Sequence, residues 1–259
     1  MASSQKIPTI IGGPVSPYVR KVLAVCEMKG IPYKLDPIVP FFGSDRFTEL
    51  SPLRRVPVFI DDQVSLCDST VICEYLDERY PTPGILPRDP ADRAQARWLE
   101  EYADTQLGDV AIWKIFNHAV IIPFVFGKER DKAKIARAVT EELPQALSYI
   151  ERVAPADGFL FGDVSIADIS VAALLRNLRW ARVELDASRW PKTTAWVDRV
   201  TATPALAKVT QYGDKLMQTA PDHHRQALAE LGVDVMDVSL ATDKPRRGPL
   251  TPESLSDMR

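Results

Sequence analysis

The stretch GGPVSPYVRKVLAVCEMKGIPYKL, residues 12 to 35, holds a complete helix with its own start and stop signals. Ser16 is a favoured N-cap residue, and Pro17 suits the first helical position because the N–H that proline lacks would have no partner there. Apolar residues then recur at helical spacing as far as Gly30, a typical residue just after a helix. The preceding residues 7–12 (IPTIIG) predict a short buried strand that ends in a glycine turn.

This alternation of strand and helix continues to residue 80. The expected elements are a strand in residues 31–38, a short helix in 44–51, strands in 56–60 and 63–67, and a helix that begins at Asp68-Ser69. A β-α-β-α-β-β-α order within so short a segment predicts a small layered α/β domain.

The second half of the chain has a different pattern. Residues 81–90 (PTPGILPRDP) contain four prolines and a glycine, which predict a linker. Helical periodicity follows, so the expected domains are 1–80, the linker 81–90, a helical domain 91–220 and a C-terminal extension 221–259. The extension has few apolar residues and several prolines, and we expect it to be partly disordered or to cover the active site.

One helix start in the second half is marked by a capping box. In Ser165-Ile166-Ala167-Asp168, the serine oxygen is expected to accept the N–H of Asp168 while the Asp168 carboxylate accepts the N–H of Ser165.

Composition excludes several classes of protein. Of 259 residues, 46% are apolar and 26% charged, and 32 basic residues against 35 acidic ones argue against a nucleic-acid partner. We find no apolar run of the roughly 20 residues that cross a bilayer and no apolar signal-peptide core, so we expect a cytoplasmic protein without a membrane partner. The three cysteines lie in apolar stretches and predict buried thiols. His118, His223 and His224 lack metal-site spacing, so no metal is expected.

Four motifs together resemble the glutathione S-transferase superfamily, in its serine-type, bacterial form. They are Ser16-Pro17 after the first strand, Val56-Pro57 at a strand entry, Asp68-Ser69 at a helix start, and the capping box in an all-helical second half. The resemblance implies an α/β thioredoxin-like N-terminal domain that binds glutathione, followed by an all-α helical bundle domain. It also implies a homodimer, a small hydrophobic electrophile as second substrate, and a role in detoxification.

Ser16 has two interpretations. As an N-cap it only stabilises the helix. A helix N-terminus also favours an anion, and a hydroxyl donor aimed at a sulfur favours the thiolate over the thiol. In families that this chain resembles, the serine at this position acts on the glutathione sulfur, which makes Ser16 the candidate catalytic residue.

Val56-Pro57 is the candidate binding segment for the cysteinyl part of glutathione. A proline at the strand entry gives no N–H to the sheet, and a cis bond before it would turn the Val56 backbone outward to pair with an extended peptide. An ordinary edge-strand proline is the alternative. The resemblance implies that Arg55 meets the glycine carboxylate, and a solvated surface arginine is the alternative there. The asparagine and glycine that are common in this loop of the superfamily are replaced here by Ser51 and Arg54.

Asp68-Ser69 is by its local pattern a helix cap. By resemblance, the Ser69 hydroxyl and N–H hold the γ-glutamyl carboxylate, and Asp68 is a shorter form of the family's usual glutamate, which faces the γ-glutamyl ammonium. Asp104 is the candidate that reaches the same ammonium across a dimer, or an exposed helix carboxylate. Trp113, Phe116 and Asn117 are candidates for the second-substrate pocket, or core residues at helical spacing.

Three functions remain open from the sequence. The first is a glutathione transferase that activates the thiolate for conjugation or displacement. The second is glutathione-dependent β-aryl ether cleavage, because DSTVICEYL at residues 68–76 is similar to that region of bacterial β-aryl etherases. The third is a non-catalytic binding or assembly protein of the same fold. A thiol–disulfide oxidoreductase of this fold would need a cysteine near the start of the first helix, where Ser16 stands.

Overall fold

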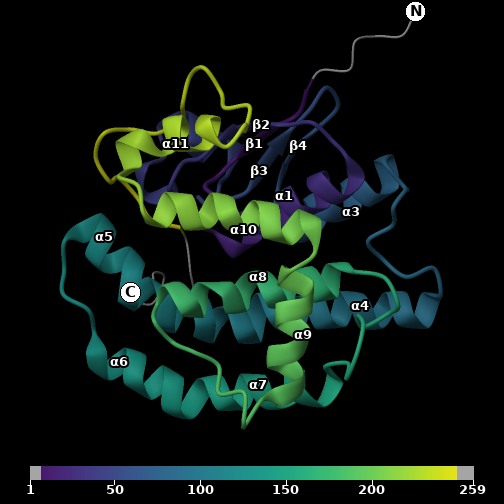
Figure 1. Cartoon of the computed structure of the whole chain (residues 1–259). Helices are drawn as coiled ribbons and strands as arrows, with labels where there is room; N and C mark the ends of the chain where they lie inside the picture. The colour runs from purple at the N-terminus through teal and green to yellow at the C-terminus, as the bar shows by residue number, and fades with distance from the viewer. Residues whose placement is uncertain (1–6, 250–259) are drawn as a thin grey trace, which may run out of the picture. The chain divides into compact units, whose positions relative to one another are not determined.

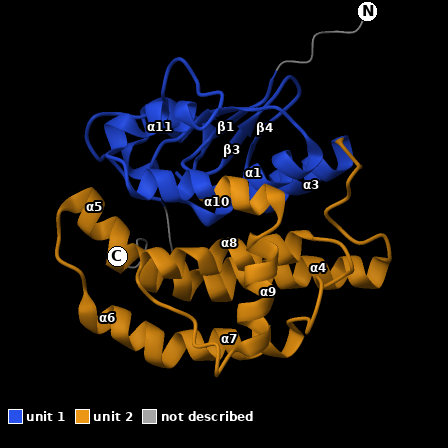
Figure 2. Ribbon diagram, viewed as in Figure 1, with its two compact units in different colours: residues 1–79, 211–259 blue, residues 80–210 orange. Residues whose placement is uncertain are grey.

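The structure is a computed structural model that describes residues 7–249. The chain divides into two compact units, residues 1–79 with 211–259 (unit 1) and residues 80–210 (unit 2) (Figure 2). The predicted boundary at residue 80 lies next to this division. Residues 211–220, which the sequence analysis assigned to the helical domain, group with unit 1 instead.

Unit 1 contains a four-stranded sheet in the order β2-β1-β3-β4 (Figure 1). β1 is parallel to β2 and antiparallel to β3, and β4 is antiparallel to β3. In chain order the elements are β1 (Thr9–Ile11), α1 (Pro17–Lys29), β2 (Lys34–Asp36), the 3₁₀ turn η1 (Pro40–Phe42), α2 (Asp45–Leu50), β3 (Val58–Ile60), β4 (Ser65–Cys67) and α3 (Ser69–Arg79). The predicted thioredoxin-like order of strands and helices is confirmed.

The strand register puts one residue of each strand in a single row at one edge of the sheet. Ile11 lies opposite Asp36 in β2 and Val58 in β3, and Val58 lies opposite Cys67 in β4. The chain leaves β1 and β4 at this row and enters β3 there. The turn before α1, the segment before β3 and the start of α3 therefore meet at the same edge.

Gly12 allows this edge to pack closely. Its φ of 138° is a conformation that residues with a side chain rarely adopt. A Cβ on Gly12 would lie 2.6 Å from Val19 Cγ2 and 2.8 Å from Val56 Cβ. The β1–α1 turn and the segment before β3 are thus in direct contact.

The C-terminal extension is folded onto the sheet of unit 1 over its described length. It forms η5 (Pro221–His223), α11 (His224–Glu230) and an extended segment (Figure 1). Val235 pairs in parallel with Leu35, next to the free edge of β2. We call residues 234–247 the C-terminal strap. We expected residues 221–259 to be partly disordered or to cover the active site. Residues 221–249 are part of unit 1, where the strap is hydrogen-bonded to β2 and to the segment after it, and 250–259 lie outside the described residues.

Unit 2 is helical, as predicted. Its elements are α4 (Pro90–Tyr102), the π-helical segments η2 (Ala103–Leu107) and η3 (Asp109–Ile121), α5 (Ile122–Phe126), α6 (Lys132–Arg137), the π-helical η4 (Ala138–Glu142), α7 (Leu143–Val153), α8 (Ile166–Trp180) and α9 (Pro191–Thr201), with α10 (Pro204–Met217) crossing the division at residue 211.

The predicted capping box starts α8, and its carboxylate has further donors. Asp168 is fully buried and accepts the N–H of Ser165 at 2.9 Å. It also accepts the indole N–H of Trp196 at 2.8 Å and the N–H of Leu160 at 3.1 Å. A buried carboxylate with this many donors is fully hydrogen-bonded and fixes the start of α8 in the core.

The continuous helix Pro90–Phe126, of 37 residues, meets a length-and-composition criterion for crossing a membrane that the sequence analysis had found unmet. A core helix meets the same criterion. Within unit 2 this helix buries Val110, Ile115 and Phe116, and Lys114 forms ion pairs with Asp109 and Glu142. These contacts fit a core helix.

Candidate functional site

The turn that precedes α1 is fixed by a buried arginine of the same helix. Arg20 has no exposed surface, and its Nη1 donates to the carbonyls of Pro14 at 2.7 Å and Val15 at 2.9 Å. The N–H of Ser16 donates to the carbonyl of Gly13 at 2.9 Å. The backbone around Ser16 is therefore held before any ligand binds.

Ser16 is the N-cap of α1, as predicted, but its capping bond is long. Its Oγ accepts the N–H of Val19 at 3.5 Å, at the outer limit of a hydrogen bond. No residue in the range 7–249 accepts the Ser16 hydroxyl proton. The half-buried Ser16 thus presents an O–H donor at the positive end of a helix of 13 residues, which favours an anion.

Val56 lies at the entry of β3, and the predicted cis bond to Pro57 is present. Within the described part of the chain, no group bonds to the N–H or the carbonyl of Val56. Its neighbour Arg55 is held at both backbone groups by Ser51, whose Oγ accepts the Arg55 N–H at 3.0 Å and donates to the Arg55 carbonyl at 2.8 Å. This segment can pair with the backbone of an extended peptide.

At the start of α3, Asp68 caps the helix and Ser69 is available to a ligand. Asp68 has a left-handed φ of 78°, and its carboxylate accepts the N–H of Thr70 at 2.9 Å, so it caps the helix. Ser69 is only 3% exposed. Neither its hydroxyl nor its N–H has a bonding partner among residues 7–249. Ser69 therefore offers two donors to a carboxylate.

The spacing of these groups suits a tripeptide. From β1 to β4 the row crosses two strand spacings, which is about 10 Å. An extended chain of three residues also spans about 10 Å. Ser16 lies just after the β1 end of this row, and Ser69 lies just after the β4 end. Val56 lies just before β3, in the middle.

Comparisons with known proteins identify the family of this chain. Residues 10–84 match the family described as "Glutathione S-transferase, N-terminal domain", and residues 116–212 match "Glutathione S-transferase, C-terminal domain". A "Probable glutathione S-transferase" of Glycine max is 30% identical over 66% of this chain and 73% of its own length. The chain belongs to the glutathione S-transferase superfamily. The predicted superfamily, fold class and enzyme class are confirmed.

A second relative and two solved structures are also similar to this chain. A "Probable glutathione S-transferase" of Solanum tuberosum is 33% identical over 48% of this chain, and the match spans only about half, 54%, of that relative. A glutathione S-transferase structure from Sinorhizobium meliloti has a TM-score of 0.73 and 24% identity, covering 85% of this chain and 99% of that one. A glutathione S-transferase structure from Methylobacterium radiotolerans, in complex with glutathione sulfonate, has a TM-score of 0.65 and 26% identity, covering 78% and 93%.

The remaining predicted residues of this transferase lie in unit 2. Asp104 is half-buried on η2, and Trp113 and Asn117 are half-buried on η3. Phe116 is 3% exposed and its ring contacts that of Trp180, with centroids 6.3 Å apart. For Phe116 this burial favours the core interpretation that the sequence had left open.

The three cysteines are free, with Cys26 and Cys73 buried and Cys67 half-buried. Burial raises the pKa of the Cys67 thiol, and the nearby Asp68 carboxylate raises it further. Cys67 Sγ donates to the carbonyl of Leu50 at 2.8 Å, so it is engaged in the fold. Among residues 7–249 no group of three or more His, Cys, Asp or Glu side chains is placed to hold a metal ion.

One residue beside the site, Arg54, was not predicted to take part in it. Arg54 stands where the common pattern has glycine, and it adopts the left-handed φ of 50° that glycine favours. Its side chain is 4% exposed and bonds to distant backbone groups. The departure from the usual loop pattern was visible in the sequence, but its partners were not.

Proposed function

We propose that this transferase binds glutathione along the row of strand ends and ionises its thiol at Ser16 for attack on an electrophilic, mostly hydrophobic second substrate. Family membership supports glutathione transferase activity. The observation that carries the assignment is the set of available groups at Ser16, Val56 and Ser69, spread over the length of a tripeptide.

Each part of glutathione has a matching group. The cysteinyl N–H and C=O pair with the carbonyl and N–H of Val56, which leaves its thiol beside Ser16. The γ-glutamyl carboxylate accepts the N–H and hydroxyl of Ser69, and Asp68 attracts the ammonium. The exposed Arg55 lies next to Val56 and attracts the glycine carboxylate.

The chemistry that follows is nucleophilic. A thiol with a pKa of about 8.5 is only a few per cent ionised at neutral pH. The Ser16 O–H donates to the sulfur, and together with the α1 N-terminus it stabilises the thiolate. The thiolate then forms a carbon–sulfur bond with the electrophile, and a leaving group, where there is one, departs with its electron pair.

We propose further that the active form is a homodimer, in which Asp104 of one chain reaches the γ-glutamyl ammonium bound by the other. Trp113 and Asn117 contribute to the pocket for the second substrate. Light scattering measures the first of these proposals directly, and a mass of one chain, 28.9 kDa, across micromolar concentrations would refute it.

Thermal melting with glutathione tests the central proposal. A ligand present at about 100 times its Kd stabilises the native state by roughly 2.7 kcal/mol, which raises the Tm. Glutathione should raise the Tm, and ophthalmate, in which a methyl group replaces the thiol, should bind at the same site. A panel of activated halogenated aromatics and aryl ethers then separates conjugation from ether cleavage. An unchanged Tm at 10 mM glutathione would remove the basis of the proposal.

A further inference from the structure

The C-terminal strap pairs with β2, the edge strand of the sheet in unit 1. The N–H of Leu35 donates to the carbonyl of Asp234 at 2.8 Å, and the N–H of Met236 donates to the carbonyl of Leu35 at 3.0 Å. Arg225 of α11 also donates to the carbonyl of Met236. Where the strap pairs with the sheet, it is therefore hydrogen-bonded both to β2 and to α11.

From there the strap reaches the row of strand ends through Asp36. This residue is fully buried, and its carboxylate accepts the Ser239 hydroxyl and the Leu240 N–H, both at 2.7 Å. The carbonyl of the same Asp36 accepts the N–H of Gly12 at 2.8 Å. Asp36 is therefore hydrogen-bonded both to the strap and to the turn that contains Ser16.

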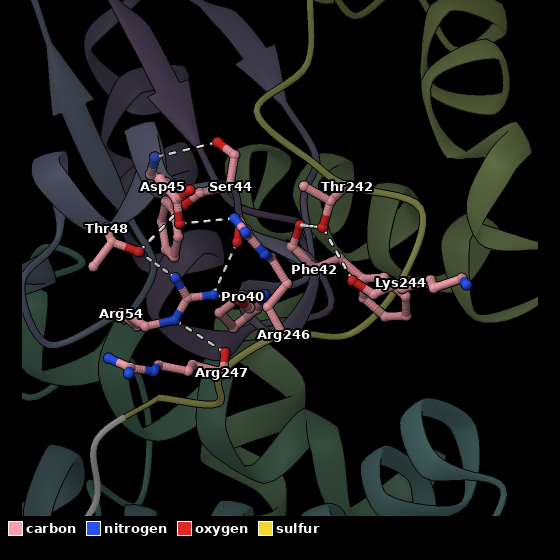
Figure 3. A network of polar contacts seen from close by, with 12 residues as sticks. Pro40, Phe42, Ser44, Asp45, Thr48, Arg54, Thr242, Lys244, Arg246 and Arg247 are labelled. Atoms are coloured by element: carbon pink, nitrogen blue, oxygen red, sulfur yellow. Dashed lines mark hydrogen bonds and ion pairs between the residues drawn. The ribbon is translucent and has the colours of Figure 1, made fainter.

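The strap also holds the segment between β2 and α2. The N–H of Ser44 donates to the carbonyl of Leu240 at 2.9 Å, and the N–H of Thr242 donates to the carbonyl of Phe42 at 2.7 Å. Arg246 forms an ion pair with Asp45 at 2.7 Å (Figure 3).

Arg54 connects this segment and the strap to the loop before β3, which contains Arg55 and Val56. Its guanidinium donates to the carbonyl of Gly43 at 3.0 Å, to the carbonyl of Arg247 at 3.0 Å, and to the hydroxyl of Thr48 (Figure 3). A fourth bond, at 3.2 Å, goes to the carbonyl of Pro40. In Figure 3 the guanidinium of Arg54 lies between Thr48, Pro40 and Arg247. Its backbone is one residue from Arg55 and two from Val56, so the position of the strap and that of the peptide-binding segment are coupled.

We propose that the C-terminal strap is a structural part of the glutathione site and that Arg54 is the positioning residue through which it acts. The strap fixes the Ser16 turn through Asp36 and the Arg55–Val56 segment through Arg54. This inference rests on the proposed function, and it adds that affinity for glutathione depends on residues 234–247, through their bonds to Asp36 and Arg54.

The test replaces Arg54 by the glycine that the family pattern has at this position. Glycine adopts a φ of 50° without strain, so Arg54→Gly removes the guanidinium bonds and leaves the backbone conformation accessible. Arg182→Gly is the matched control, because Arg182 also has a left-handed φ, of 62°, but is exposed and lies in unit 2. Arg54→Lys keeps the charge but loses the planar set of donors.

Glutathione binding is measured by isothermal titration calorimetry, which separates Kd from the number of competent sites. A merely structural role for Arg54 would lower the number of sites and the Tm, and leave the Kd of folded molecules unchanged. We expect the Kd to rise at least tenfold in Arg54→Gly, with a smaller rise in Arg54→Lys and none in Arg182→Gly. The KM for the second substrate should stay within twofold in all three.

Hydrogen exchange supplies a second readout in the wild-type chain. Saturating glutathione should slow exchange at the strap amides of Met236, Leu240 and Thr242. A second variant, Ser239→Ala, removes one donor to Asp36 and tests the other branch if Arg54→Gly does not fold, with the same rise in Kd expected.

Two results would overturn the inference in different ways. If the wild-type chain binds glutathione and both Arg54→Gly and Ser239→Ala change the Kd by less than twofold, the role of the strap is rejected and the proposed function is not. Failure of the wild-type chain to bind glutathione would reject the proposed function, and this inference with it.

Discussion

Arg54 Nε donates to the backbone carbonyl of Arg247 at 3.0 Å, although 193 residues separate the two in the chain. Burial lowers the pKa of the Arg54 guanidinium, and the neighbouring Arg246 and Arg247 lower it further. A buried cation is stable only when its donors are satisfied. The bond to Arg247 satisfies one of these donors and connects the C-terminal strap to the loop that precedes β3.

Asp36 should give the unfolding free energy a specific pH dependence. Burial raises the pKa of its carboxyl above the ordinary 3.8, although bonds from Leu240 and Ser239 and the charge of Arg225 oppose the shift. The native state then binds more protons than the unfolded state just above pH 3.8. In that window this group makes stability fall as pH rises.

Asp36→Asn removes this contribution and can keep both contacts to the strap, because its amide oxygen can accept the Leu240 N–H while its NH2 group donates to Ser239 Oγ. We expect the slope of unfolding free energy against pH, measured by urea denaturation, to become more positive in the variant just above the ordinary carboxyl pKa. Asp163→Asn, at an exposed carboxylate of unit 2, serves as the control for removal of one charge. An unchanged slope in Asp36→Asn would show that the Asp36 pKa is not raised.

Gly12→Ala should destabilise unit 1 strongly. A Cβ there would lie 2.6 Å from Val19 Cγ2, and alanine would also have to adopt a φ of 138°. Backbone strain of about 1–3 kcal/mol and overpacking of about 1–3 kcal/mol predict a loss of about 2–6 kcal/mol. Gly30→Ala is the matched control, because Gly30 has a φ of 64° with open space around it, and should lose only about 1–2 kcal/mol. Equal losses in urea denaturation would contradict the close approach at Gly12.

Ser69→Ala should weaken glutathione binding with little effect on folding. The Ser69 hydroxyl has no partner in the described part of the chain, so its removal costs the fold little. A hydrogen bond to a charged group contributes about 1.5–3 kcal/mol, which predicts a rise of roughly 10- to 100-fold in the KM for glutathione. Ser65→Ala, at an exposed serine of β4, should leave this KM unchanged. Steady-state kinetics with varied glutathione decide the point, and equal KM values in both variants would exclude Ser69 from the site.

The parts of the fold that the sequence predicted are those with local signals. Ser16 and Gly30 mark the ends of α1 within 15 residues, and both occupy the expected cap positions. The positions of Val56-Pro57 at a strand entry and of Asp68-Ser69 at a helix start likewise depend on residues within one turn or strand. Local geometry of this kind can be read from short patterns because the interacting groups are neighbours in the chain.

The strap could not be predicted because its partners are distant and its own sequence is polar. Leu240 bonds to Asp36 across 204 positions, and no periodic pattern connects them. Few apolar residues and several prolines are also typical of disordered segments. Here backbone pairing with an edge strand and one buried carboxylate order the segment instead, and neither depends on a hydrophobic pattern.

Ser16→Ala separates the two interpretations of Ser16. Because the capping bond is 3.5 Å long, we expect a stability loss at the low end of the range for N-caps, about 0.5 kcal/mol. If the hydroxyl also holds the thiolate, the lost bond of about 1.5–3 kcal/mol raises the pKa of bound glutathione by roughly one to two units. Conjugation should then slow by roughly 10- to 100-fold at neutral pH, and the difference should shrink as pH rises.

The measurement is the pH profile of turnover at saturating glutathione for the wild type and Ser16→Ala. Asp131→Ala removes the N-cap of α6, which accepts the Lys134 N–H at 2.9 Å, and should cost about 1 kcal/mol of stability without moving the profile. Glutathione affinity should change little in Ser16→Ala, since Val56 and Ser69 bind the rest of the tripeptide. If the wild-type and Ser16→Ala profiles superimpose, Ser16 is a cap alone, and thiolate stabilisation must come from the α1 N-terminus or from another donor.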